Sequence, residues 1–410
     1  MGSPIEIQSC EVCGNKTLQP VLDLGLHPRC DDLVPIGDDR VCVESPIEIL
    51  YCTVCATAHQ RFQVPKLELF PSDYHYRSRF TADVLNGMKA LVDSCEKRLG
   101  NLSGKTVLDI GCNDGSLLDF FSKKGCTTVG IEPTGAWIDG SEKGHHIYNA
   151  YFAPFSAEKI LAEHGSPDIV TFTNVFAHIE NLPELISALK ILISKNTTLV
   201  IENHYLGSVL DRSQFDTFYH EHPRTYSFSS FLHISNTIGT QFCAVEFPSR
   251  YGGNIRVFLG SLPPIEDMDY WIRKMGEEES VYPEKFQQLQ NNIRNWRGSM
   301  AKEIERLIGD NGRLFAKAFP GRAAILVKLL GLDATSIETV YEKPGSLKVG
   351  HYVPGTRIPI RSDAEFFAKT TKPEVILNLA WHISAEIHGY LRTHGFEGKI
   401  IDILTPEQFQ

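Results

Sequence analysis

The stretch Val107-Leu-Asp-Ile-Gly-Cys-Asn-Asp-Gly115 joins a short apolar run to a turn that contains two glycines. An apolar strand that leads into a glycine-rich turn and then a helix is typical of the first strand of a doubly wound sheet. Asp109 lies near the end of this strand, and the glycines stand where the backbone must pass close to a ligand. The stretch therefore predicts the nucleoside-binding edge of a parallel sheet.

Strand and helix patterns alternate on both sides of this stretch. We expect strands over 106–110, 128–131, 168–173 and 198–201, and helices over 81–99 and beginning near Gly115 and Leu182. A charged helical connection is expected over 264–314, followed by strands over 323–326, 337–341 and 375–379. Strands separated by helices predict an α/β protein with a doubly wound parallel sheet and a second, smaller α/β domain.

Glu132 ends the second expected strand, 23 residues after Asp109. A carboxylate at this place can accept hydrogen bonds from both ribose hydroxyls of an adenosine. Asn113 and Asp114 occupy the middle of the turn, so it is not a GxGxxG sequence, which disfavours a pyrophosphate cofactor. The turn favours S-adenosylmethionine, which carries no phosphate. The alternative is a strand and turn of the same fold that bind no ligand.

Two CxxC pairs, Cys10 with Cys13 and Cys52 with Cys55, predict one closed, structural zinc site with four sulfur ligands. The alternatives are ordinary thiols or two disulfides. Residues 1–72 are rich in proline, glycine and aspartate and offer few apolar residues for a core. A bound metal is a common way to stabilise such a region.

The composition is that of an ordinary globular protein of two or three domains, with 410 residues, 42% hydrophobic and 22% charged. A net charge of −10 argues against a general nucleic-acid-binding surface. The sequence shows no basic and apolar leader and no apolar run of about eighteen residues, so we expect a cytoplasmic protein with no membrane partner. Its oligomeric state, monomer or dimer, stays open.

With these motifs the sequence resembles the sugar C-methyltransferases of deoxysugar pathways over nearly the whole chain. The resemblance implies a zinc-binding domain over 1–72, a Rossmann-like S-adenosylmethionine domain over 73–262, and a helical connection with a C-terminal Rossmann-like, substrate-binding domain over 263–410. It also implies methylation of a nucleotide-linked 4-keto-deoxysugar at C3. The cofactor contacts that it implies are Tyr76, Asp109, Gly111, Asn113, Asp114, Glu132, Phe152, Asn174 and Val175.

Tyr219-His-Glu-His222 is similar to the Tyr-x-Glu-His active-site motif of that family. Methylation of carbon requires a base that removes a proton beside a carbonyl group and a group that stabilises the enolate oxygen. The resemblance implies that His222 is the base, with Tyr219 and Glu221 as its neighbours, and that His178 or Tyr219 holds the enolate oxygen. The alternatives are histidines that only pack, or a metal-binding His-x-His pair, although the chemistry requires no Lewis acid.

The resemblance also implies contacts with the substrate. Tyr74 is similar to a tyrosine of the family near the substrate, and a set of polar and basic residues is expected to close on the nucleotide-linked sugar: Asn254, Arg256, Lys348 and Arg357. The chain departs from the family pattern at Ala150, where an acidic contact to the adenine of the cofactor is expected, and in Ala318–Ala324 and at His382, which leaves the sugar and the nucleotide open. Other hypotheses are an O- or N-methyltransferase and a zinc-containing protein without catalytic activity.

Overall fold

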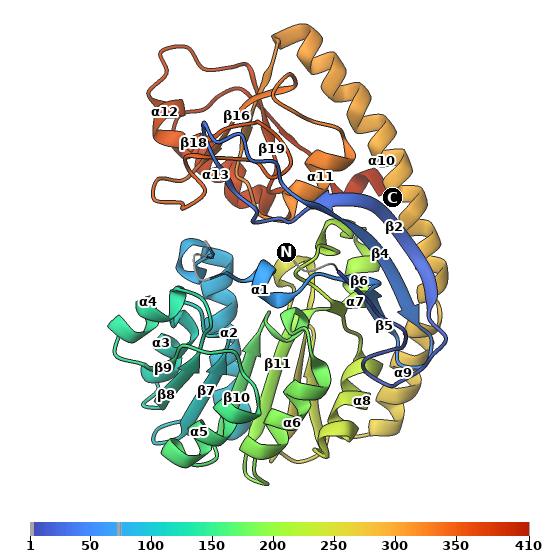
Figure 1. Ribbon diagram of the computed structural model, residues 1–410, viewed down its shortest axis with the longest axis vertical. Coiled ribbons are helices and arrows are strands. Elements are labelled where there is room, and N and C mark those ends of the chain that lie inside the picture. Colours follow the sequence, from blue (N-terminus) through green and yellow to red (C-terminus); the bar gives the residue numbers. More distant parts are fainter. Residues whose placement is uncertain (1–3, 72–73, 75, 410) are drawn as a thin grey trace.

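The computed structural model describes residues 4–71, 74 and 76–409. Figure 1 shows the central sheet and its helices in the lower part and the C-terminal α/β part above them. Strands β2 and β4 and the long helix α10 (Tyr282–Asn311) run along one side of both parts. This arrangement brings the ends of the chain's two large sheets toward one another.

The central sheet has seven strands in the order β13-β14-β11-β10-β7-β8-β9. The strands from β11 to β9 are parallel to one another, and β14 runs antiparallel to β11. The strands are β7 (Thr106–Ile110), β8 (Thr127–Ile131), β9 (His146–Tyr148), β10 (Ile169–Thr173), β11 (Thr198–His204), β13 (Phe242–Glu246) and β14 (Asn254–Gly260). The strands expected from the sequence in this region are confirmed.

Helices cover both faces of the central sheet (Figure 1). They are α2 (Ala82–Leu99), α3 (Ser116–Ser122), α4 (Ala136–Glu142), α5 (Pro154–His164), α6 (Leu182–Leu192) and α8 (Phe228–Ile238). Helix α7 (Leu206–Asp211) packs against α10. Helix α6 shows why they form: the Asn181 side chain caps its first turn, Pro183 lies in that turn, and a buried apolar stripe faces the sheet.

The N-terminal part forms an antiparallel sheet in the order β12-β5-β4-β2. Its strands are β2 (Gln19–Pro28), β4 (Glu44–Cys52), β5 (Thr57–Gln60) and β12 (Arg224–Thr225), while β1 (Ile5–Glu6) pairs with β6 (Phe62–Gln63) and α1 (Lys66–Leu69) follows. Strand β12 comes from the middle of the chain and pairs with β5. The motif of residues 219–222 is therefore fixed against the N-terminal part.

The C-terminal sheet is parallel, in the order β18-β16-β15-β19-β20. It consists of β15 (Leu314–Lys317), β16 (Ile337–Glu342), β18 (Ile360–Ser362), β19 (Val375–Asn378) and β20 (Lys399–Asp402), with helices α11 (Ala323–Leu329), α12 (Asp363–Phe367) and α13 (Ser384–Thr393). Strand β17 (His351–Tyr352) pairs with β3 (Val34–Pro35) of the N-terminal part.

One expected strand is wrong. Residues 323–326 begin helix α11, and the strand of this region is β15, just before them. A short, continuous apolar run fits a buried strand and a buried helix equally well, so its periodicity cannot separate the two. The expected helical connection is confirmed as α9 (Met268–Ser280) followed by α10.

The four N-terminal cysteines gather in one place. Their sulfur atoms lie within 4.8 Å of one another, with Cys10 Sγ 3.4 Å from Cys55 Sγ and Cys13 Sγ 3.6 Å from Cys52 Sγ. A tetrahedral zinc ion with Zn–S distances of about 2.3 Å separates its ligands by about 3.8 Å. All four cysteines are free, so the alternative of two disulfides is wrong. The donor set and its spacing fit a closed, structural zinc site.

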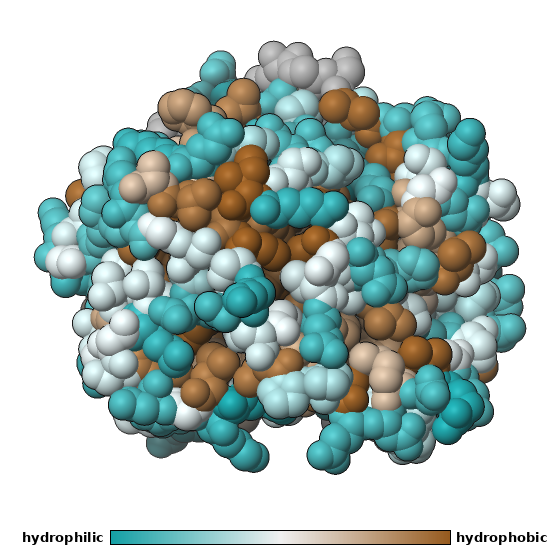
Figure 2. All heavy atoms as spheres, turned by 90° about the horizontal axis from the view of Figure 1, so that it is seen from below, coloured by the Kyte–Doolittle hydropathy of each residue, from teal (hydrophilic) through white to brown (hydrophobic). Residues whose placement is uncertain are grey.

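Figure 2 shows the molecule from below, with hydrophilic residues over much of the surface and apolar residues in patches among them. The large apolar side chains are mainly packed in the cores around the two sheets. Among the described residues, no helix is long and apolar enough to span a membrane.

We predict that Cys52→Ser protein loses zinc and that its N-terminal part becomes less stable, because the free energy of metal binding contributes to folding there. Elemental analysis of the unsubstituted protein, purified without chelator, should find about one zinc per chain. Cys126→Ser is the matched control, since Cys126 lies outside the cluster. A zinc content below about half an equivalent in a folded protein would contradict the assignment.

Candidate active site

A cavity of about 530 Å³ lies between the central sheet and the C-terminal part. Its wall includes Ile110 and Ile131 at the carboxyl ends of β7 and β8, and Lys317 at the carboxyl end of β15. Cys30 and Asp31, from the loop after β2, complete it. Ligands of open α/β sheets bind at the carboxyl ends of the strands, and here two such edges face one cavity.

Most of the residues that the sequence assigned to the cofactor come together along one wall of this cavity. They are Tyr76, Asp109, Gly111, Asn113, Glu132, Phe152, Asn174 and Val175. Gly111 has a φ of +69°, and a Cβ atom built on it would lie 2.6 Å from Cγ1 of Val175, so a side chain does not fit. Asp114 lies outside the lining: it is buried, and its Oδ1 accepts hydrogen bonds from Ser116.

Glu132 presents a fixed carboxylate to the cavity. Its Oε2 accepts a hydrogen bond from the Asn113 backbone at 3.0 Å, and its Oε1 accepts bonds from the backbone and hydroxyl of Thr134 at 2.9 and 2.6 Å. Burial raises its pKa, although these donors oppose the shift. Burial also raises the pKa of Asp109 to about 7. A held carboxylate at the end of β8 suits the recognition of a ribose diol.

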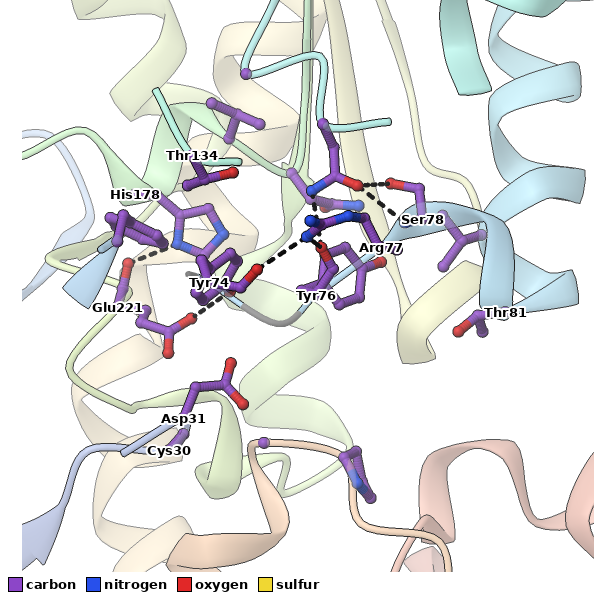
Figure 3. Close-up of a pocket in the computed structure, with 18 of the residues that line it drawn as sticks. Cys30, Asp31, Tyr74, Tyr76, Arg77, Ser78, Thr81, Thr134, His178 and Glu221 are labelled. Atoms are coloured by element: carbon purple, nitrogen blue, oxygen red, sulfur yellow. Dashed lines mark hydrogen bonds between the residues drawn. The ribbon is translucent and has the colours of Figure 1, made fainter. Parts of the chain in front are cut away.

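A segment before α2 covers the glycine turn, as Figure 3 shows. Arg77 Nη1 donates to the carbonyl oxygens of Tyr74 and Tyr76 at 2.8 and 2.9 Å, and Arg77 Nε donates to Asp139 at 2.7 Å. The Ser78 backbone donates to the Asn113 side chain at 3.0 Å. These bonds place Tyr76 over the turn that the sequence assigned to the cofactor.

The two histidines proposed from the sequence lie together. The ring centroids of His178 and His222 are 4.7 Å apart, and the Tyr219 ring lies 4.3 Å from that of His222. His204, at the end of β11, lies 5.5 Å from His222. All four side chains line the cavity, so the fold collects these polar rings from separate segments.

The hydrogen bonds of the histidines determine their tautomers. His178 Nδ1 lies 2.7 Å from the Glu221 carbonyl oxygen, and His222 Nδ1 lies 2.8 Å from the Thr217 carbonyl oxygen. A carbonyl oxygen only accepts, so each Nδ1 must carry the proton and donate it. In the neutral ring of His222, Nε2 is therefore a hydrogen-bond acceptor and a candidate base, whereas His178 also hydrogen-bonds the backbone of Asn174.

Burial keeps these rings neutral. It lowers the pKa of His178 to about 4 and the pKa of His222 well below its usual range, with His178 and His204 adding repulsion to a charge on His222. At neutral pH neither ring is therefore an imidazolium, and His222 has its lone pair on Nε2.

Glu221 belongs to the same wall. Tyr74 donates its hydroxyl hydrogen to Glu221 Oε2 at 3.2 Å, and Asp31 faces Glu221 in Figure 3. Burial raises the pKa of Glu221 well above its usual range, and the negative charge of Asp31 is the second cause of this rise. Lys348 Nζ lies 3.5 Å from Asp31 Oδ1.

The expected substrate contacts divide between the cavity and other places. Tyr74 and Lys348 line the cavity, and within the described residues its lining does not include Asn254, Arg256 or Arg357. Asn254 and Arg256 bond to the buried Glu202, and Arg357 donates to the carbonyl oxygens of residues 38–40. In this structure the hydrogen bonds of these three side chains are made within the protein.

Sequence reasoning missed several residues of the lining. They include Asp31, Arg77, His204, Arg250, Lys317 and Arg322. The sequence could have indicated Lys317 as a site residue, because it lies at the end of a strand, before the turn of a second doubly wound sheet. Asp31 carried none, because a single aspartate in a loop gives no indication of what it faces.

Comparisons with known proteins agree with this geometry. Family models match residues 79–240 as a methyltransferase domain, residues 249–403 as a C-methyltransferase C-terminal domain, and residues 10–70 as a "Putative zinc binding domain". The chain is 26% identical over 387 residues to the C-methyltransferase NovU of Streptomyces niveus, covering 93% of this chain and 91% of that one.

Two further relatives match smaller parts. Ubiquinone biosynthesis O-methyltransferase from Acinetobacter baumannii is 23% identical over 138 residues, which cover 33% of this chain and 52% of the relative. The structure of magnesium protoporphyrin IX methyltransferase from Synechocystis, with bound SAH, is 17% identical, with a TM-score of 0.34, and the match covers 44% of this chain and 84% of that one.

The fold and the matched domains define an S-adenosylmethionine-dependent methyltransferase with a zinc-binding N-terminal part. The C-methyltransferase C-terminal domain and the nearly full-length relative agree with methyl transfer to a carbon atom.

We predict that Glu132→Ala weakens binding of S-adenosylhomocysteine by about 1.5 to 3 kcal/mol, the scale of hydrogen bonds to a charged group. Isothermal titration calorimetry measures the change. Glu163→Ala, an exposed carboxylate at the end of α5 and outside the cavity, is the control. Equal affinity of the Glu132 variant and the unsubstituted protein would place the ribose elsewhere.

Proposed function

We propose that this C-methyltransferase acts on a nucleotide-linked 4-keto-deoxysugar and transfers the methyl group to C3. The observation that carries the proposal is the neutral His222, whose Nδ1 proton is held by the Thr217 carbonyl oxygen, beside His178 in a cavity that joins the cofactor wall to a second α/β sheet. A carbon atom becomes a nucleophile only when a neighbouring carbonyl group accepts charge, and the 4-keto group makes C3 such an atom.

The proposed roles of the side chains follow from their hydrogen bonds. His222 Nε2 removes the proton from C3, and the electron pair of that C–H bond moves toward the ketone oxygen. S-Adenosylmethionine supplies the methyl group, and the wall that contains Gly111 and Glu132 would hold it. We assign the hydrogen bond to the enolate oxygen to Tyr219, because neutral His178 has one N–H and its ring already hydrogen-bonds the backbone of Glu221 and Asn174.

We keep the domain division at 1–72, 73–262 and 263–410 as part of the proposal. The third domain would hold the nucleotide, because the carboxyl ends of β15 and β16 face the cavity. Lys348 is the proposed basic contact with the diphosphate. Contacts from Asn254, Arg256 and Arg357 would require a rearrangement of the hydrogen bonds described above.

We predict that His222→Gln abolishes both methyl transfer and exchange of the C3 proton with deuterium from solvent, while affinity for S-adenosylhomocysteine stays unchanged. A general base contributes about a hundred- to ten-thousandfold, so the loss should be large and confined to chemistry. Mass spectrometry of a panel of nucleotide 4-ketosugars, incubated with enzyme in D₂O without methyl donor, measures the exchange.

The control for this experiment is His146→Gln, because His146 is exposed on β9 and lies outside the cavity. Exchange at the unsubstituted rate in the His222 variant, with loss in His178→Gln, would reverse the two roles. Methylation of oxygen or nitrogen without any proton exchange would instead show an O- or N-methyltransferase.

The low pKa of the base gives a prediction for the pH profile. Because burial lowers the pKa of His222, the ring stays neutral and active as pH falls through 6.5, the usual value for histidine. The acid limb of kcat/KM, which reports the free enzyme, should therefore lie below pH 6.5. An acid limb at or above that pH would show that the base is not a buried, neutral histidine.

A further inference from the structure

Two carboxyl groups from remote segments, the buried Glu221 and the half-buried Asp31, meet in the wall of the active site. Asp31 lies in the loop between β2 and β3, and Glu221 lies in the segment before β12. Both line the main cavity, and Figure 3 shows their carboxyl groups facing one another beside Tyr74. The two negative charges would repel one another, and the charge of Asp31 favours the protonated form of Glu221.

The surroundings decide which member is charged. Lys348 Nζ lies 3.5 Å from Asp31 Oδ1, so the cation stabilises the Asp31 carboxylate. The neighbour of Glu221 Oε2 is the neutral hydroxyl of Tyr74, at 3.2 Å. Burial and the Asp31 charge raise the pKa of Glu221. The proton of the pair therefore belongs to Glu221.

A protonated Glu221 supplies what the histidines of the site lack. Each neutral ring has one N–H, and backbone carbonyl groups accept it in both His178 and His222, so neither ring has a hydrogen left to donate to the substrate. An enolate oxygen needs donors, and a neutral carboxylic acid in an apolar site is an effective one.

We propose that Asp31 is a positioning residue that keeps Glu221 protonated, so that the Glu221 carboxylic acid donates a hydrogen bond to the substrate oxygen that takes up negative charge. This inference rests on the proposed function. The C3–H bond breaks, its proton goes to His222 Nε2, and its electron pair forms the enolate. Glu221 keeps its proton throughout. The enolate carbon then bonds to the methyl group, and the sulfur atom keeps the electrons of the broken S–CH₃ bond.

The charges around the pair come from several elements. On the side of the main cavity, the titratable groups near Glu221 are Cys30, Asp31, Tyr74, His178, Tyr219 and Lys348. On the other side, a second cavity of about 150 Å³ is lined by Asp31, Tyr74 and Glu221 together with Arg29, Asp32, Arg40 and Glu68. Arg40, at the edge of this second cavity, is exposed and pairs with Asp32.

The sign of the expected effect follows from the charge of Asp31. A neighbouring negative charge raises the pKa of Glu221, so Asp31→Asn should lower it. The protonated form of Glu221 is then lost at a lower pH. Asp31→Glu keeps the charge and should restore the original titration.

Infrared difference spectroscopy of the zinc-loaded, full-length protein tests this without substrate or cofactor. The carbonyl band of a protonated carboxyl group should be present at pH 7 and absent from Glu221→Gln protein, which separates it from other protonated carboxyl groups such as Asp109, whose pKa is raised to about 7. In Asp31→Asn the midpoint of this band should move down by at least about one pH unit.

Asp39→Asn is the charge-matched control, because Asp39 is exposed and lies outside both cavities. The inference is overturned if Glu221 is ionised at neutral pH, or if the midpoints of the Asp31→Asn and Asp39→Asn proteins are equal. If Asp31→Asn protein does not fold, the Glu221→Gln difference spectrum alone still decides whether Glu221 is protonated. The band needs no sugar substrate, so failure of the proposed function is detected separately, by the exchange experiment.

Discussion

The buried carboxylate of Asp216 is the contact on which the active site depends. Arg322, at the start of α11, donates to its two oxygens at 2.8 and 2.5 Å, and Trp381 Nε1 donates to one of them at 2.8 Å. Breaking a buried ion pair costs about 3 to 5 kcal/mol, because the remaining charge has no compensation. The C-terminal part is therefore fixed to the segment that contains Tyr219, Glu221 and His222.

The same segment is held from its other side by the N-terminal part. The Gln60 backbone donates to the Pro223 carbonyl oxygen at 2.8 Å, the Gln60 side chain donates to the Tyr219 carbonyl oxygen at 3.3 Å, and β12 extends the sheet through β5. Strand β5 follows Cys55 directly. Zinc binding is thus linked through a short stretch of chain to the position of the catalytic motif, which gives a small metal-stabilised part a role in the geometry of the reaction.

The sequence predicts well those parts of the fold that depend on local pattern. The strands around Asp109 and Glu132 and the four cysteines have strong signals in periodicity and spacing. The strand predicted over residues 323–326 was wrong because an apolar run of this length shows no periodicity that separates a strand from a helix. The position of Asp31 beside Glu221 depends on how three parts of the chain pack. The ion pair between Arg256 and Glu202 depends on the pairing of β11 with β14. Neither relation is encoded by spacing.

Burial of the histidines has a chemical consequence that the rest of the site must offset. A lower pKa keeps His222 neutral, yet it also makes the ring a weaker base, so the enolate has to be stabilised by other groups. Tyr74, Tyr219 and Glu221 are the hydrogen-bonding groups of this wall, and burial raises the pKa of each, which keeps them in their donating forms. The sulfonium charge of the cofactor would add a positive field on the opposite side. One physical factor, the removal of water from the wall, therefore sets both the acceptor state of the base and the donor state of its partners.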